Sequence, residues 1–316
     1  VLRTHFRHQI VGYVRKYLGR TFSWIEIVSS FIGGFGALTV YLIGIGVSLA
    51  AIFGGSALHY SLIYFVIGAI LLFFGLRVIK VCELWLVPLF IVLIAIIAVV
   101  SGGHFQLANF QSMHWYNILV PYGVILFAFG GKGGVVPLRE VLRREPEKIK
   151  KAVLISSLVP LIIYIIFSIA IVGVTGASTT EVATVGLGQM LGDGILLFGN
   201  IFAVLAMASG FINLGLIMEE IMLFDFRLPK VLSWLLIILV PLVIFLSQVG
   251  GFIKIMAIAG SLTFGISGIN SVLMYWKAKK AGDRTPEFSM PKFKIIGLLL
   301  IAMFAAGIGY VVAQLL

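Results

Sequence analysis

The chain has 316 residues, of which 61% are hydrophobic and only 11% are charged. A soluble domain carries about a quarter charged residues, so this composition excludes an ordinary soluble fold and makes lipid the solvent for much of the chain. The net charge of +11 would favour a nucleic-acid partner in a soluble protein. Here the basic residues gather at the ends of apolar runs, which indicates topological charge bias and no nucleic-acid partner.

Nine apolar runs are long enough to cross a bilayer, whose hydrocarbon core of about 30 Å needs roughly 20 residues per helix. They cover residues 24–53, 61–79, 84–101, 117–136, 152–174, 194–217, 231–248, 252–275 and 295–316. The loops between them are short, the longest being 102–116 and 175–193, and no soluble domain is inserted. The sequence therefore predicts an all-α polytopic membrane protein forming a single transmembrane domain.

The basic residues orient this predicted bundle. If residues 1–23 form a cytoplasmic loop, 21 of the 23 Lys and Arg residues fall on the cytoplasmic side, and only Lys132 and Lys254 do not. By the positive-inside rule, the side of residue 1 is cytoplasmic and the C-terminus lies outside after nine crossings. We expect an integral protein of the cell membrane.

Several predicted helices contain clustered small residues. The run 24–53 holds Gly33, Gly34, Gly36, Gly44 and Gly46, and the run 252–275 holds Gly260, Ser261, Gly265 and Gly268. We interpret both sets as positions where helices approach closely, with a ligand role as the alternative for the first set.

The run 117–136 is different, because it contains Gly130-Gly131-Lys132-Gly133-Gly134, followed by Pro137. Each glycine weakens a helix by about 1 kcal/mol relative to alanine, so this stretch is not expected to be helical. Irregular backbone at membrane depth survives only where it is buried in protein or lines a cavity. Secondary transporters build substrate sites at such interruptions. The alternative is a glycine-rich packing crease between close helices.

Residues 122–153 contain Phe127-Ala128-Phe129-Gly130 followed by Val135-Val136-Pro137 and a basic loop. This pattern resembles the sixth transmembrane segment of the amino acid/auxin permease family and its bacterial aromatic amino acid permease relatives. Residues 203–225 resemble the eighth segment of the same family more weakly. Both families belong to the amino acid–polyamine–organocation superfamily.

The resemblance implies the LeuT-like fold, which has two inverted five-helix repeats and often an eleventh helix. Residues 24–101 would then be helices 3–5 of the first repeat, 117–275 helices 6–10 of the second, and 295–316 helix 11. Helices 1 and 2 would be missing. The basic segment 5–20 resembles the loop after helix 2, so we expect the chain to be a fragment or to begin late.

An amino acid substrate needs groups that bind a carboxylate, an ammonium and a side chain. Peptide groups freed at the interruption supply the first two. The predicted substrate-binding residues of this segment are Phe127, Phe129, Gly130, Gly131, Lys132, Gly133 and Gly134. Lys132 is also a candidate for coupling-ion chemistry, because an ionisable group at membrane depth is a functional candidate by default. Its alternative is a vestibule position, and the alternative for the phenylalanines is lipid or core contact.

Further candidates come from the resemblance. Ser209 lies where the related families place a sodium-coordinating hydroxyl, and Asn213 shares its helix face. Tyr41 resembles the tyrosine of helix 3 that faces the central site. Their alternatives are an intrahelical hydroxyl bond for Ser209 and a core aromatic for Tyr41. Tyr164 and Asn200 are weaker candidates. The acidic residues at the cytoplasmic end of this segment are expected to be solvated gating or structural charges, with Arg227 or Lys230 as nearby partners; they are Glu219, Glu220 and Asp225.

No catalytic or metal-binding constellation is visible, so we expect neither an enzyme nor a cofactor beyond a coupling H⁺ or Na⁺. Cys82 stands alone and forms no intrachain disulfide. The histidines show no metal-ligand spacing, and no phosphate-binding loop of the ATPase type occurs. The five histidines are His5, His8, His59, His104 and His114.

The function that these features favour is cation-coupled amino acid symport by alternating access. The alternative is a membrane protein without coupled transport, either a channel or a transceptor that senses amino acids. A channel needs several polar pore-lining positions, and only Lys132 lies clearly at depth. The sequence does not determine which amino acid is transported or which ion is coupled to it. It also does not distinguish symport from exchange or determine the oligomeric state.

Overall fold

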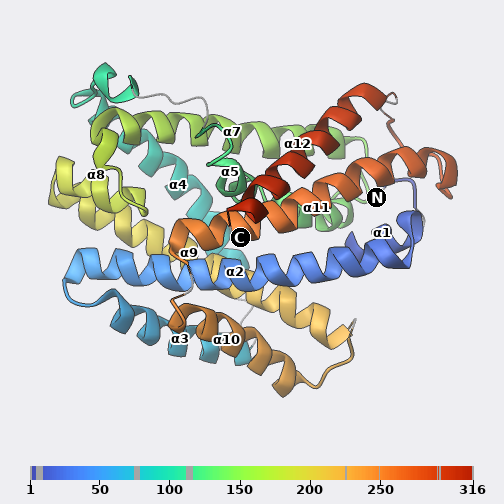
Figure 1. The fold of residues 1–316 in the computed structure, drawn as a ribbon, viewed down its shortest axis with the longest axis horizontal. Helices are drawn as coiled ribbons and strands as arrows, with labels where there is room; N and C mark the ends of the chain where they lie inside the picture. Colours follow the sequence, from blue (N-terminus) through green and yellow to red (C-terminus); the bar gives the residue numbers. More distant parts are fainter. Residues whose placement is uncertain are drawn as a thin grey trace. The chain divides into compact units, whose positions relative to one another are not determined.

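The computed structural model describes residues 2–4, 10–74, 79–111, 117–224, 226–248, 250–289, 291 and 293–314. Within these ranges only the backbone is described for 79–85, 132–133, 136–137, 140 and 224. Every regular element of the described residues is helical (Figure 1). In chain order these are α1 (Ile10–Leu18), α2 (Arg20–Phe53), α3 (Ala57–Phe74), α4 (Ile79–Gly102), η1 (Leu107–Phe110), α5 (Tyr122–Ala128), η3 (Gly131–Gly134), α6 (Val135–Val141), α7 (Lys148–Thr175), η4 (Gly176–Ser178), α8 (Ala183–Leu191), α9 (Asp193–Phe224), α10 (Lys230–Leu246), α11 (Phe252–Ala281) and α12 (Lys294–Ala313).

Among the residues that the structure describes, six helices are long and apolar enough to cross a membrane. They are Arg20–Phe53, Ala57–Phe74, Lys148–Ser178, Asp193–Leu223, Phe252–Ala281 and Lys294–Ala313. The apolar stretches Leu86–Gly102 and Lys230–Leu246 are shorter, and 117–136 is not one helix. The membrane character of the chain is confirmed, whereas the count of nine spanning helices stays a prediction.

Helix ends extend beyond the apolar runs, because a helix continues into the interface after its apolar stretch ends. α2 begins at Arg20 and α11 ends at Ala281, with Lys279 and Lys280 in its last turn. Long basic side chains keep their charge in water while their stems cover apolar surface, so they suit these ends. The segments predicted as loops also contain helices: α1 lies within 1–23, η1 within 102–116, and η4 and α8 within 175–193.

The chain divides into two compact units. Unit 1 comprises Val1–Gly33, Tyr116–Pro160 and Met256–Leu316, and unit 2 comprises Gly34–Trp115 and Leu161–Ile255.

In unit 1, the short helix α5 packs against α11 and α12. The α11 glycines predicted as a packing stripe are confirmed in this role. A Cβ atom at Gly265 would lie 2.9 Å from Ile308 of α12, and one at Gly268 would lie 2.5 Å from Phe304. Close backbone approach without a side chain is the usual reason for small residues at membrane helix interfaces.

In unit 2, α9 is the central helix and contacts α3, α4, α8 and α10. α3 and α10 also lie side by side (Figure 1). The glycines of α2 pack as predicted: a Cβ atom at Gly44 would lie 3.0 Å from Phe252, and one at Gly46 would overlap Ser61 of α3. Gly54 and Gly55 make the turn to α3 with φ values of 72° and 87°, a backbone conformation that favours glycine.

Candidate functional site

The predicted interruption of the segment 117–136 is confirmed. α5 ends at Ala128, η3 forms a 3₁₀ turn over Gly131–Gly134, and α6 starts at Val135. At the end of α5, the N–H of Phe129 donates to Ile125 O at 3.0 Å, and the N–H of Gly130 donates to Phe127 O at 3.1 Å. The α-helical hydrogen-bond ladder therefore stops where the glycines begin, as their low helix propensity requires.

One side of this interruption is covered by an aromatic ring that the sequence analysis did not single out. A Cβ atom at Gly130 would overlap the ring of Phe264 in α11. At Gly131 and Gly134 an added Cβ would meet no atom within 4 Å. The turn thus has one face packed on Phe264 and another open at these two glycines. Phe264 lies within the small-residue stripe of α11, directly before Gly265, but nothing in its sequence context relates it to Gly130.

The helix before the turn is held against α11 by backbone contact. A Cβ atom at Gly123 of α5 would overlap Ala257 O of α11, and one at Gly260 would overlap Gly123 O. On the α12 side, Tyr122 Oη donates to Phe304 O at 3.4 Å, and a Cβ at Gly307 would overlap the Tyr122 ring. These contacts fix α5, and with it the position of Phe127 and Phe129.

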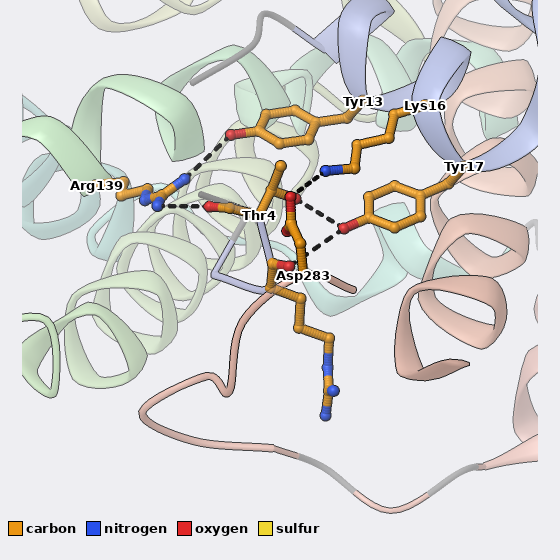
Figure 2. A network of polar contacts seen from close by, with 7 residues as sticks. Thr4, Tyr13, Lys16, Tyr17, Arg139 and Asp283 are labelled. Carbon is orange, nitrogen blue, oxygen red and sulfur yellow. Dashed lines mark hydrogen bonds and ion pairs between the residues drawn. The ribbon is translucent and has the colours of Figure 1, made fainter. Parts of the chain in front are cut away.

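The helix after the turn is held by a polar cluster, which we call the Arg139 cluster (Thr4, Tyr13, Lys16, Tyr17, Arg139 and Asp283). Arg139 of α6 donates to Thr4 O at 2.8 Å and to Tyr13 Oη at 3.3 Å. Figure 2 shows its guanidinium directed at both acceptors. Thr4 and Tyr13 are buried, so these bonds are shielded from water.

Three further contacts at the Arg139 cluster join residues 2–4, α1 and the segment after α11 to one another. The hydroxyls of Thr4 and Tyr17 are 2.7 Å apart, and Lys16 Nζ lies 2.5 Å from Asp283 Oδ2 (Figure 2). The N–H of Asp283 donates to Arg3 O at 3.0 Å. The interruption is therefore flanked by a packed α5 and an anchored α6, and it has one open face.

The predicted residue Tyr41 of α2 lies against α9 in unit 2 and within electrostatic range of Tyr164 of α7. A Cβ atom at Gly210 would lie 2.9 Å from the Tyr41 ring, so Tyr41 packs on α9 beside Ser209. Ser209 makes no hydrogen bond within the described part of the chain, and Asn213 is exposed.

The predicted site residues fall in both units. Phe127, Phe129, Gly130, Gly131 and Gly134 belong to unit 1, whereas Tyr41, Ser209 and Asn213 belong to unit 2. Lys132 and Gly133 lie in the η3 turn, but their side-chain positions fall outside the description. That all these residues form one site stays a prediction. Asn200 has a structural place, because its side chain bonds to Leu196 O at 2.8 Å and to Thr184 Oγ1 at 3.0 Å.

Two buried carboxylates were missed or misjudged by sequence reasoning. Glu26 of α2 is 1% exposed and accepts hydrogen bonds from the Ser267 hydroxyl and from Asn270 Nδ2, the latter at 2.7 Å. Its position at the edge of an apolar run was the available signal.

Glu219 was expected to be solvated, which is wrong: it is 6% exposed. The position of Glu219 near a helix end predicted solvent exposure, but the packing of α9 buries this side chain. Glu220 is exposed, and Asp225 lies outside the described residues.

Among the side chains that the structure describes, no group of three or more His, Cys, Asp and Glu residues is placed to hold a metal ion.

These features define a class. The chain is an all-helical membrane protein with an interrupted helix, open on one face and fixed on both sides. Discontinuous helices of this kind are where secondary transporters bind substrate. The chain belongs to the tryptophan/tyrosine permease family, whose model matches residues 2–313. Among curated proteins none matches the chain. Family membership makes it a membrane permease for amino acids and points away from an enzyme.

Proposed function

We propose that this protein is a secondary active transporter that carries an aromatic amino acid together with a cation by alternating access. The observation that supports this most directly is the interrupted segment α5–η3–α6 in a chain of the tryptophan/tyrosine permease family. The family description names two aromatic amino acids, and the aromatic residues at the turn agree with such a substrate.

The proposed substrate site is the open face of the turn. Gly131 and Gly134 are exposed, and an added Cβ at either would meet no described atom within 4 Å, so a ligand can approach the backbone there, although the Gly131 N–H already donates to Phe129 O at 2.7 Å. Exposed N–H groups bind the substrate carboxylate and exposed carbonyls bind its ammonium. Phe127 and Phe129 would form a wall for an aromatic side chain, since aromatic pairs gain contact area and favourable ring geometry. Phe129 is 41% exposed, which leaves its ring available to a ligand.

The remaining predicted residues complete this proposal. In the LeuT-like arrangement that the resemblance implies, Tyr41 would face the substrate from helix 3. Ser209 and Asn213 would contribute oxygens to a coupling-ion site on helix 8. The hydroxyl of Ser209 supports such a role, because it makes no intrahelical hydrogen bond among the described residues. Lys132 would act either on the substrate carboxylate or in place of a cation.

The proposed membrane orientation puts the Arg139 cluster on the cytoplasmic side. The segments around it hold most basic residues of the chain, which is the pattern of cytoplasmic loops. In an alternating-access cycle, an inward-open state would require α6 to move relative to α1. The Arg139 cluster would then form and break once per cycle.

The test is uptake of labelled tryptophan, tyrosine and leucine by the purified protein in liposomes. We expect accumulation of at least one aromatic amino acid, driven by an inward pH or Na⁺ gradient and abolished by ionophores that dissipate it. Counterflow exchange in the absence of any gradient measures substrate translocation separately from coupling. An absence of both uptake and counterflow for all amino acids tested would contradict the proposal.

A further inference from the structure

A buried carboxylate lies at the end of α9, away from the interrupted helix. Glu219 is 6% exposed, and its Oε1 atom has neither solvent contact nor a hydrogen-bond partner among the described residues. Removing an ionised carboxylate from water without partners costs far more than removing the neutral acid. The environment of Glu219 in this conformation therefore suits a protonated side chain.

The buried neighbours of Glu219 on its own helix are apolar. Met218 and Met222, its neighbours on α9, are buried. One turn earlier, a Cβ atom at Gly215 would lie 2.7 Å from Leu72 of α3. Since residues four apart share a helix face, Glu219 lies on the face of α9 that packs toward the end of α3.

A lysine of the same unit acts electrostatically on this carboxylate and forms no ion pair with it among the described residues. The charge of Lys230, the first residue of α10, acts on Glu219. Neither residue forms an ion pair in the described part of the chain. Instead, Lys230 Nζ lies 5.5 Å from the centroid of the Phe73 ring, a cation–π contact.

The aromatic contacts beside Lys230 are fixed by packing. Trp234 Nε1 donates to Ala69 O at 2.9 Å, and the Trp234 and Phe73 rings meet edge to face at 5.2 Å. These contacts hold the start of α10 against the end of α3. Glu219, Lys230 and Phe73 thus come from three helices of the same unit: the ammonium contacts the Phe73 ring, and its charge acts on Glu219.

We propose that Glu219 binds and releases the coupling proton, and that Lys230 changes partner with its protonation state. When Glu219 is protonated, it stays buried as the neutral acid, and Lys230 rests on Phe73. When the proton leaves to water, the carboxylate becomes an anion and the Lys230 ammonium moves from the ring to pair with it. The inference rests on the transport activity proposed above and assigns H⁺ as its coupling ion.

Other charged groups act on or lie near this pair. Glu220 follows on α9, is exposed and acts on Glu219 as a like charge. The part of α2 in this unit carries no charged residue. Of the charged residues at the end of α3 and the start of α4, Arg77 and the side chains of Lys80 and Glu83 lie outside the description. The proposal concerns Glu219 and Lys230, whose contacts the structure gives.

The experiment compares coupling with translocation in liposomes containing the wild-type protein, Glu219→Gln or Glu219→Asp. Glutamine imitates a permanently protonated acid, so we expect counterflow within about twofold of wild type and pH-driven accumulation at least tenfold lower. Proton entry, followed with a trapped pH-sensitive dye, should fall with accumulation. Glu219→Asp should retain coupling. Glu220→Gln, which removes the same charge from the exposed neighbour, should behave as wild type.

A second variant tests the partner exchange. Lys230→Gln removes the cation that stabilises ionised Glu219, so half-maximal pH-driven uptake should shift by about one pH unit or more toward alkaline pH, while Lys230→Arg should not shift it. The inference is overturned if Glu219→Gln accumulates substrate as wild type does, or if a Na⁺ gradient alone drives the wild type. It is also overturned if Lys230→Gln leaves the pH profile unchanged. Absence of wild-type counterflow would instead contradict the transport function itself.

Discussion

At the scale of single residues, adjacent glycines of the interruption have different surroundings. Gly130 lies against the Phe264 ring, so its missing side chain is a packing requirement. Gly131 faces open space, so its missing side chain leaves the backbone accessible. The sequence shows only a row of glycines, and the distinction comes from α11.

Alanine substitutions at Gly130 and Gly131 should therefore have different effects on stability and on transport. Gly130→Ala forces the Phe264 ring to move, and overpacking of this kind costs about 1–3 kcal/mol. We expect a lower melting temperature in detergent and reduced uptake. Gly131→Ala should keep the wild-type melting temperature but raise the KM for the substrate, because it covers peptide groups of the proposed site.

Two matched variants control this comparison. Gly309→Ala adds a methyl group in α12 where an added Cβ meets nothing within 4 Å, and it should change neither property. Phe264→Leu combined with Gly130→Ala should restore part of the lost stability. Equal melting temperatures for Gly130→Ala and Gly131→Ala would show that the Phe264 contact does not matter.

At the scale of elements, α6 has only 7 residues and too few turns to be stable alone. Its position depends on the Arg139 cluster, in which one guanidinium holds both the backbone of Thr4 and the side chain of Tyr13. The two donors of a planar guanidinium reach both acceptors at once, which a lysine ammonium does less well.

Arg139→Lys should therefore loosen residues 2–4 and α1. The substitution keeps the positive charge at position 139, and trypsin can still cut after this residue. A charged hydrogen bond contributes about 1.5–3 kcal/mol, and local opening follows such losses. We expect trypsin to cut after the exposed Arg15 or Lys16 at least about fivefold faster than in wild type. Glu145→Gln breaks only the exposed pair with Lys148 and should leave the rate unchanged. Equal cleavage rates for Arg139→Lys and wild type would rule out the anchoring role.

At the scale of the whole molecule, the orientation proposed from the basic residues is open to direct measurement. After Cys82→Ala removes the native thiol, single cysteines are placed at Leu107, Glu181 and Glu147. Leu107 is 77% exposed, and the other two are also exposed. A membrane-impermeant thiol reagent applied to intact cells should label positions 107 and 181 and not 147. Permeabilised cells should show labelling at all three positions, and the reverse pattern in intact cells would invert the topology.

Much of the fold could be predicted from the sequence because its cause is local. Apolar length determines which segments can span a bilayer, and four glycines in five residues end a helix wherever they occur. The sequence motifs around Phe127–Pro137 were likewise sufficient to indicate an amino acid permease, and the family match over residues 2–313 agrees. The helices α1 and α8 were missed because they are short, and their stability comes from packing. Val14 of α1 and Leu187 of α8 are both 0% exposed.

What the tertiary structure decided is which neighbour each residue meets. Charges near helix ends look solvated in a sequence, yet Glu26 meets Ser267 and Asn270 across 241 residues or more of chain, and Glu219 is enclosed by α9 and its neighbours. The sequence by itself determined a lipid-embedded helical permease with one interrupted helix, because composition and helix propensity act locally. Only the folded chain could show that the interruption packs on Phe264, that Arg139 anchors α6, and that Glu219 lies buried where the charge of Lys230 acts on it, because burial and pairing depend on how the helices pack.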